Sequence, residues 1–81
     1  MPKQSKIREL VQSVSKNWSD PGPEDPLFDS GVLDSFELTD LVAALEQTYN
    51  IQVPDSDLTP RKFESIARIE AYLESRGVLI Q

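Results

Sequence analysis

The sequence contains no cysteine and no histidine among its 81 residues. Without cysteine, the chain has no disulfide framework and no thiolate to act as a nucleophile or metal ligand. Without histidine, the Ser/His/Asp and Cys/His catalytic arrangements, the commonest acid–base catalysts and nearly every transition-metal site are excluded. We expect no metal site and none of these catalytic arrangements, and any thiol chemistry must be supplied by a cofactor.

Long apolar runs are also lacking. No segment approaches the length of a membrane-spanning helix, and residues 1–6 lead into a mixed charged helix without the apolar region of an export signal. The chain length suits one small domain. We predict a single domain over residues 1–81 that is soluble, monomeric and cytoplasmic, and the absence of cysteine is compatible with that compartment.

Basic residues are absent from the middle of the chain. Between Asn17 and Pro60 there is no lysine or arginine, whereas ten of the 14 acidic residues lie there and the net charge is −6. Phosphate groups bind surfaces of opposite sign, so we expect no nucleic-acid partner. In the simplest interpretation the acidic surface serves solubility, and it also suits electrostatic steering towards basic partner enzymes.

Three segments repeat apolar residues every three or four positions, which is the period of an amphipathic helix. They span residues 3–17, Ser35–Tyr49 and residues 66–76, the last behind Ser65 as N-cap. Their predicted core side chains are Ile7, Leu10, Val11, Val14 and Trp18, then Leu38, Leu41, Val42, Leu45 and Tyr49, then Ile66, Ile69, Tyr72 and Leu73. Asn50 and Gly77 suit the left-handed conformation that ends many helices.

The connections carry proline and a few apolar anchors. Three prolines between Asn17 and Asp34 exclude a regular helix there. The side chains predicted to anchor this long connection are Leu27, Phe28, Val32 and Leu33. Residues 51–54 are too short and isolated for a strand, and residues 55–66 lack the glycine and the final acid of a calcium loop. Thr59 as a capping residue before Pro60 at the first helical position predicts one short turn, Pro60–Phe63. The fold class is therefore all-α, a small four-helix bundle of three main helices and one short helix.

The best-defined helix start lies at Gly31–Leu38. Asp34 is a good N-cap residue and Glu37 stands three residues later, which is the spacing of a capping box. The helix should begin within a residue of Ser35 and present the serine hydroxyl at its start. An Asp-Ser pair before an apolar helix is by itself only a cap, so the assignment of Ser35 depends on the surrounding pattern.

That pattern resembles the acyl carrier protein family. Asp34-Ser35-Phe36 is similar to the family's Asp-Ser-Leu motif, and the resemblance extends from Leu27 to about Leu73. It implies that Ser35 bears 4'-phosphopantetheine, transferred from coenzyme A by a separate phosphopantetheinyl transferase that uses Mg²⁺. It also implies that acyl or aminoacyl groups travel as thioesters from a loading ligase to downstream synthase or transferase enzymes of fatty-acid, polyketide, lipid or aminoacyl-transfer pathways. The protein itself would then be a substrate and shuttle, without catalytic residues or enzyme activity.

A recognition surface is expected beside the serine. Helical projection places Phe36 nearly opposite the core stripe, together with Asp40 and Ala43, and leaves Glu37 at the flank. We predict that Phe36 is exposed and that partner enzymes contact Asp34, Phe36, Glu37, Asp40 and Ala43. The other possibility is that the preceding loop folds over Phe36.

Two departures from the family pattern concern the cargo. Phe36 stands where leucine is usual, and Asp57–Ser65 is more similar to the corresponding stretch of D-alanyl and peptidyl carriers than to that of fatty-acid carriers. The cargo and pathway therefore stay open. An alternative from another class is an unmodified acidic helical adaptor that docks through the Ser35–Asn50 helix.

Overall fold

The computed structural model describes residues 5–78, and this part of the chain is helical without strands. The elements are α1 (Ser5–Val14), α2 (Ser35–Tyr49), the 3₁₀ turns η1 (Asp55–Asp57) and η2 (Pro60–Phe63), and α3 (Ile66–Ser75). The all-α prediction is confirmed for these residues. The predicted short fourth helix is only partly supported, because residues 55–63 form two 3₁₀ turns.

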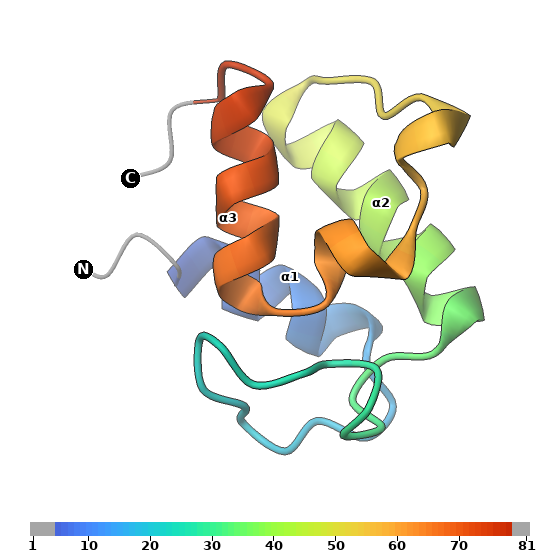
Figure 1. The fold of residues 1–81 in the computed structure, drawn as a ribbon, viewed down its shortest axis with the longest axis vertical. Coiled ribbons are helices and arrows are strands. Elements are labelled where there is room, and N and C mark those ends of the chain that lie inside the picture. The colour runs from blue at the N-terminus through green and yellow to red at the C-terminus, as the bar shows by residue number, and fades with distance from the viewer. Residues whose placement is uncertain (1–4, 79–81) are drawn as a thin grey trace.

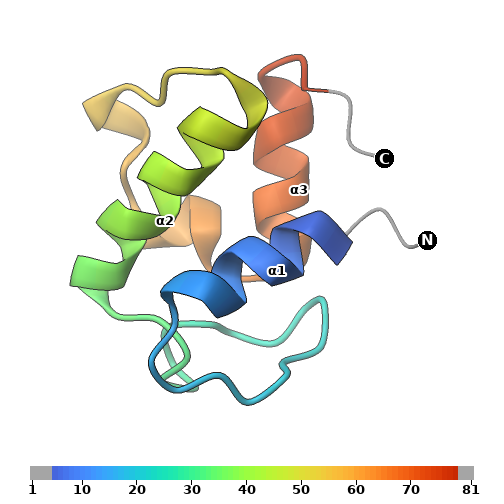
Figure 2. The same cartoon turned by 180° about the vertical axis from the view of Figure 1, so that it is seen from behind.

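The helices surround one small core. In Figure 1, α2 and α3 stand on either side of η2, and Figure 2 shows α1 on the opposite face, in front of the lower part of α3 and below α2. α1 contacts α2 and α3, while η2 contacts the same two helices from the other side. Phe63 carries this contact, since its side chain is fully buried and its ring centroid lies 5.2 Å from that of Tyr72. The η2 turn therefore helps to close the space between α2 and α3.

The predicted core stripes are largely confirmed. The fully buried large side chains include Ile7, Leu27, Leu41, Leu45, Phe63, Ile66, Ile69 and Leu73. Four predicted core residues pack on the margin instead and are only partly buried: Leu10, Val14, Trp18 and Tyr49. For Trp18, at the end of its stripe, we expect a cover over the core rather than full burial, and its ring does pack against the core. The Arg8 guanidinium lies over this ring, 5.5 Å from its centroid.

The end of α1 differs from the prediction. The helix ends at Val14, whereas the periodicity predicted a helix up to Asn17. Ser15 diverts the chain, because its hydroxyl accepts the Asn17 N–H at 3.2 Å and donates to the Val32 carbonyl at 2.6 Å. The N-terminal start of the predicted helix and the apolar residues Leu79 and Ile80 lie outside the described residues. Val78 packs against the core.

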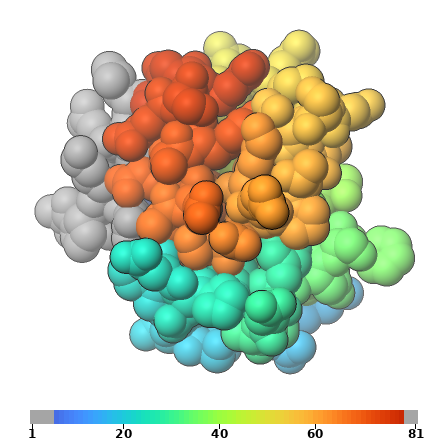
Figure 3. Space-filling model, viewed as in Figure 1, coloured from blue at the N-terminus to red at the C-terminus, as the bar shows by residue number. Residues whose placement is uncertain are grey.

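The long connection before α2 is anchored, as predicted. Leu27, Val32 and Leu33 are buried, and Phe28 is partly buried against the same core. Backbone hydrogen bonds also fasten this segment to the start of α3: the Leu27 N–H donates to the Glu64 carbonyl at 2.7 Å, and the Ala67 N–H donates to the Pro23 carbonyl at 2.8 Å. Figure 3 shows residues of this segment as a continuous band against η2 and α3.

The turn at Pro60 is a 3₁₀ turn because it is short. The segment has only four residues, and the Lys62 N–H donates to the Thr59 carbonyl at 3.2 Å. This i→i+3 hydrogen bond is the pattern of a 3₁₀ helix, which usually occurs in short pieces. Thr59 occupies the N-cap position, but its side chain makes no capping hydrogen bond, contrary to the prediction. Ser65 does cap α3, accepting the Arg68 N–H at 3.1 Å.

Candidate functional site

The start of α2 is held by the predicted capping box. The Asp34 carboxylate accepts the Glu37 N–H at 2.8 Å, and the Glu37 carboxylate accepts the Asp34 N–H at 3.1 Å. Gly31, with φ of +85°, turns the chain into this start without the steric penalty of a side chain. The capping box satisfies two of the backbone donors that a helix start leaves free.

Ser35 is the first residue of α2 and is exposed. Within residues 5–78, no hydrogen bond or ion pair engages its hydroxyl. The hydroxyl is also at the positive end of the helix dipole, where negative charge is stabilised. The structure therefore presents an exposed serine hydroxyl at the first residue of a capped helix.

Glu37 differs from its expected position. It is only 6% exposed, whereas the projection put it at the flank of the outer face. The reason is a second hydrogen bond from a distant segment: the Lys16 N–H donates to Glu37 Oε2 at 3.0 Å. Two backbone donors thus compensate the burial of this carboxylate. Ser15 and Lys16 were not singled out from the sequence, where no periodic or motif signal marks them.

Of the other predicted recognition residues, Phe36, Asp40 and Ala43 lie on the outer face of α2, and Asp34 is its N-cap. Phe36 is 82% exposed, so the possibility that the loop folds over it is wrong. Asp34, Asp40 and Ala43 are exposed as well. A large aromatic side chain next to Ser35 is therefore open to solvent beside two carboxylates.

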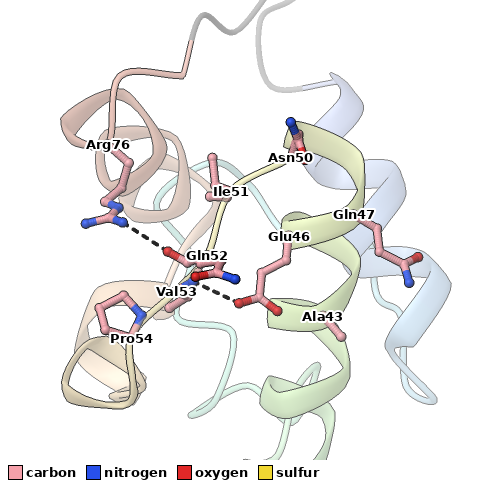
Figure 4. A pocket seen from close by; sticks show the side chains of 9 residues that line it. All are labelled: Ala43, Glu46, Gln47, Asn50, Ile51, Gln52, Val53, Pro54 and Arg76. Carbon is pink, nitrogen blue, oxygen red and sulfur yellow. Dashed lines mark hydrogen bonds between the residues drawn. The ribbon is translucent and has the colours of Figure 1, made fainter.

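A groove at the far end of α2 was not foreseen. It has a volume of about 680 Å³ and lies between the end of α2, the following connection and Arg76 (Figure 4). The Val53 N–H donates to Glu46 Oε2 at 2.8 Å, and Arg76 donates to the Gln52 carbonyl at 3.0 Å. The first contact holds the chain that leaves α2 against that helix, and the second ties it to the end of α3.

A polar contact joins η1 to α3. The Tyr72 hydroxyl donates to Asp57 Oδ2 at 2.8 Å, and Lys62 lies 3.3 Å from the other oxygen of the same carboxylate. Burial and this hydrogen bond raise the pKa of Tyr72 to about 12. The Tyr72 hydroxyl and then Lys62 lower the pKa of Asp57, although desolvation opposes the shift. Both shifts favour the charge states that make the contact.

In residues 5–78 there is no group of three or more side chains of the metal-binding types placed to hold an ion. Across the same residues, no helix combines the length and apolarity needed to cross a membrane.

Comparison with known proteins agrees with this arrangement. Residues 5–73 match the family model described as "Phosphopantetheine attachment site". The chain is also 39% identical over 46 residues to the D-alanyl carrier proteins of Streptococcus pyogenes serotype M1 and of serotype M49 (strain NZ131). That alignment covers 57% of this chain and 58% of each relative. Since the family model spans most of the sequence, the chain belongs to the phosphopantetheine attachment site family, the carrier proteins that bear covalent 4'-phosphopantetheine.

Proposed function

We propose that Ser35 is the attachment residue and that the protein carries acyl or aminoacyl groups between partner enzymes, as a substrate and shuttle rather than a catalyst. The observation that carries this proposal is the exposed Ser35 hydroxyl, unpartnered within residues 5–78, at the start of α2. When attached, the cofactor supplies a terminal thiol on which cargo is held as a thioester. The absence of cysteine from the sequence is compatible with a reducing cytoplasm, where we place this role.

The residues around Ser35 fit a phosphodiester. Asp34 caps the Glu37 N–H, which leaves the Ser35 and Phe36 N–H groups at the helix start for negative charge. The Asp34 carboxylate is itself engaged in the capping box, where it accepts the Glu37 N–H. We infer that α2 stabilises the modified serine without needing a cation from the protein.

Partner enzymes are proposed to dock on the outer face of α2. Phe36 offers apolar area, while Asp34, Asp40 and the small Ala43 leave an acidic surface around it. Carboxylates at the rim of an interface act mainly on encounter rate, and a buried aromatic acts on bound lifetime. In this proposal Glu37 does not contact the partner directly, because it is buried, and it contributes by holding the start of α2. The partners are a phosphopantetheinyl transferase, a loading ligase and a downstream transferase or synthase.

For the cargo, we propose an aminoacyl group. The support is the similarity to proteins named D-alanyl carrier protein, which covers 46 aligned residues. Incubating the modified carrier with ATP, D-alanine and a D-alanyl ligase, in parallel with malonyl and long-chain acyl donors and their transferases, separates the cargo classes by intact mass. Preferential loading by acyl donors would overturn the aminoacyl assignment and leave the attachment site unaffected.

Attachment is tested by intact mass after incubation with coenzyme A, Mg²⁺ and a broad-specificity phosphopantetheinyl transferase. The unaltered chain should gain one phosphopantetheine, and Ser35→Ala should gain none. Ser30→Ala is the matched control, because Ser30 is exposed in the loop before α2 and should be dispensable. An unmodified wild-type chain would instead favour the helical adaptor, and an adduct on Ser35→Ala would place the attachment elsewhere.

A further inference from the structure

A buried carboxylate lies directly behind the start of α2. Glu37 Oε1 accepts the Asp34 N–H at 3.1 Å, and Glu37 Oε2 accepts the Lys16 N–H at 3.0 Å. Asp34 immediately precedes Ser35, whereas Lys16 lies in the chain that leaves α1. One side chain therefore ties the end of α1 to the start of α2.

A second link lies next to the first. The Ser15 hydroxyl donates to the Val32 carbonyl at 2.6 Å, and Val32 is buried in the core. Two successive residues after α1 are thus bonded to two points of the chain around Asp34. We name the set Ser15, Lys16, Val32 and Glu37 the α1–α2 clasp.

The α1–α2 clasp supplies hydrogen bonds that fix the start of α2. Within the described residues the Ser35 side chain makes no hydrogen bond or ion pair, so its place depends on the backbone of the first turn of α2. First turns of helices fray readily unless their free donors are satisfied. We propose that Glu37 is a positioning residue for Ser35: by holding Asp34 to Lys16, it keeps Ser35 and Phe36 in register with the outer face of α2. This inference rests on the proposed function of Ser35.

The physical effect acts on reaction geometry. A transferase that grips the outer face of α2 through Asp40 and Ala43 meets the Ser35 hydroxyl one to two turns away. If the first turn frays, docking on the later turns survives while the hydroxyl leaves its place. Small misplacements of a reacting group cost rate, so kcat for modification should fall more than KM rises.

The same helix provides a matched control. Glu46 Oε2 accepts the Val53 N–H at 2.8 Å, so Glu46 also holds a neighbouring backbone segment, but at the end of α2 remote from Ser35. Glu46→Ala and Glu37→Ala both remove a carboxylate that accepts backbone N–H groups from outside the helical ladder. Only Glu37→Ala should affect the serine.

The experiment measures modification kinetics and amide exchange on the full chain. Rates with coenzyme A and a phosphopantetheinyl transferase are normalised to the folded fraction. Glu37→Ala is expected to lower kcat/KM by about 10- to 100-fold, while Glu46→Ala leaves it unchanged. Glu37→Gln should recover part of the rate, because its single carbonyl oxygen can still complete the capping box but its amide cannot accept the second N–H.

Amide exchange provides a readout independent of the transferase. The Lys16 N–H should exchange faster in Glu37→Ala and in Glu37→Gln, and stay protected in Glu46→Ala. Equal modification rates for the two alanine variants, or unchanged Lys16 protection in Glu37→Ala, would overturn the inference alone. A wild-type chain that is not modified at Ser35 would overturn the proposed function and this inference with it.

Discussion

At both ends of α2 a glutamate carboxylate accepts backbone N–H groups of a neighbouring segment, but the two ends expose different side chains. At the start, Glu37 holds backbone N–H groups of the residues that precede the helix, and at the end Glu46 holds the Val53 N–H of the chain that follows. The start is capped by Asp34, whereas the end is closed by Asn50 in the left-handed conformation, with φ of 54°. Both ends are therefore fastened to their neighbours.

The two ends of α2 differ in what they expose to solvent. The start leaves Ser35 and Phe36 exposed, while the end leaves a groove lined by amides, apolar side chains and Arg76. At the start, the Glu37 carboxylate that joins the two segments is buried, whereas the Ser35 side chain is exposed. We infer that stability and presentation are separable here: substitutions of the capping and fastening residues at either end should destabilise the helix, but only those at the start should change modification.

Leu41→Ala should have the largest effect, because it weakens the support of both ends together. Leu41 is fully buried near the middle of α2. Truncation should reduce the free energy of unfolding by about 2–5 kcal/mol, a large share of the roughly 5–15 kcal/mol typical of a domain. Urea unfolding followed by circular dichroism measures this loss. Gln47→Ala, exposed on the same helix, is the control, and an equal midpoint for both variants would contradict the prediction.

Phe36→Ala should lower the modification of Ser35 without lowering the stability of the fold. The ring is exposed, so the melting temperature should stay close to that of the wild type. If a transferase buries the ring, up to roughly 1.5–3 kcal/mol of binding is lost, and modification efficiency falls. Charge reversal at Asp40 should slow modification most at low salt, because salt screens the attraction between exposed charges. Its effect should be smaller than that of Phe36→Ala, since exposed ion pairs contribute only about 0–1 kcal/mol. Kinetics at two salt concentrations test both statements, and a destabilised Phe36→Ala with normal modification of its folded fraction would refute them.

Removing the caps compares the two ends directly. Asp34→Ala should cost about 0.5–2 kcal/mol of stability through loss of the N-cap. Asn50→Ala should cost a similar amount, about 1–2 kcal/mol, because alanine is strained at positive φ. Only Asp34→Ala should slow modification of the folded fraction. Asn50→Gly, which tolerates this φ, should keep most of the stability, and slower modification of the Asn50 variants would show that the ends are coupled.

The smallest effect concerns pH and the contact between Asp57 and Tyr72. The lowered pKa of Asp57 means that its contribution to stability is present above the ordinary aspartate pKa of 3.8 and is lost as pH falls through the lower folded value. The raised pKa of Tyr72 means that its contribution is present below pH 10 and is lost as pH rises from 10 to about 12. Melting temperatures across both limbs should fall less steeply in Tyr72→Phe, while modification of Ser35 at neutral pH stays normal.

Local chemistry made much of this protein readable from the sequence. The capping box at Asp34, the left-handed Asn50 and the N-cap Ser65 each depend on neighbours within four residues, and all three are confirmed. The exposure of Phe36 follows from the helical period alone, and the core stripes of α2 and α3 do too. Such features need only one segment and the geometry of a helix.

The end of α1 and the burial of Glu37 depend on hydrogen-bond partners far along the chain, so only the tertiary structure decided them. α1 stops at Val14 because Ser15 and Lys16 bond to Val32 and Glu37, which lie 17 and 21 residues away. Glu37 is buried for the same reason, although a helical projection places it at the flank of an exposed face. Hydrogen-bonding groups choose among all donors and acceptors that packing brings near, and a one-dimensional pattern contains only those nearby in sequence. The sequence alone thus determined where α2 begins and that Ser35 opens it, while packing against α1 decided what holds Ser35 in place.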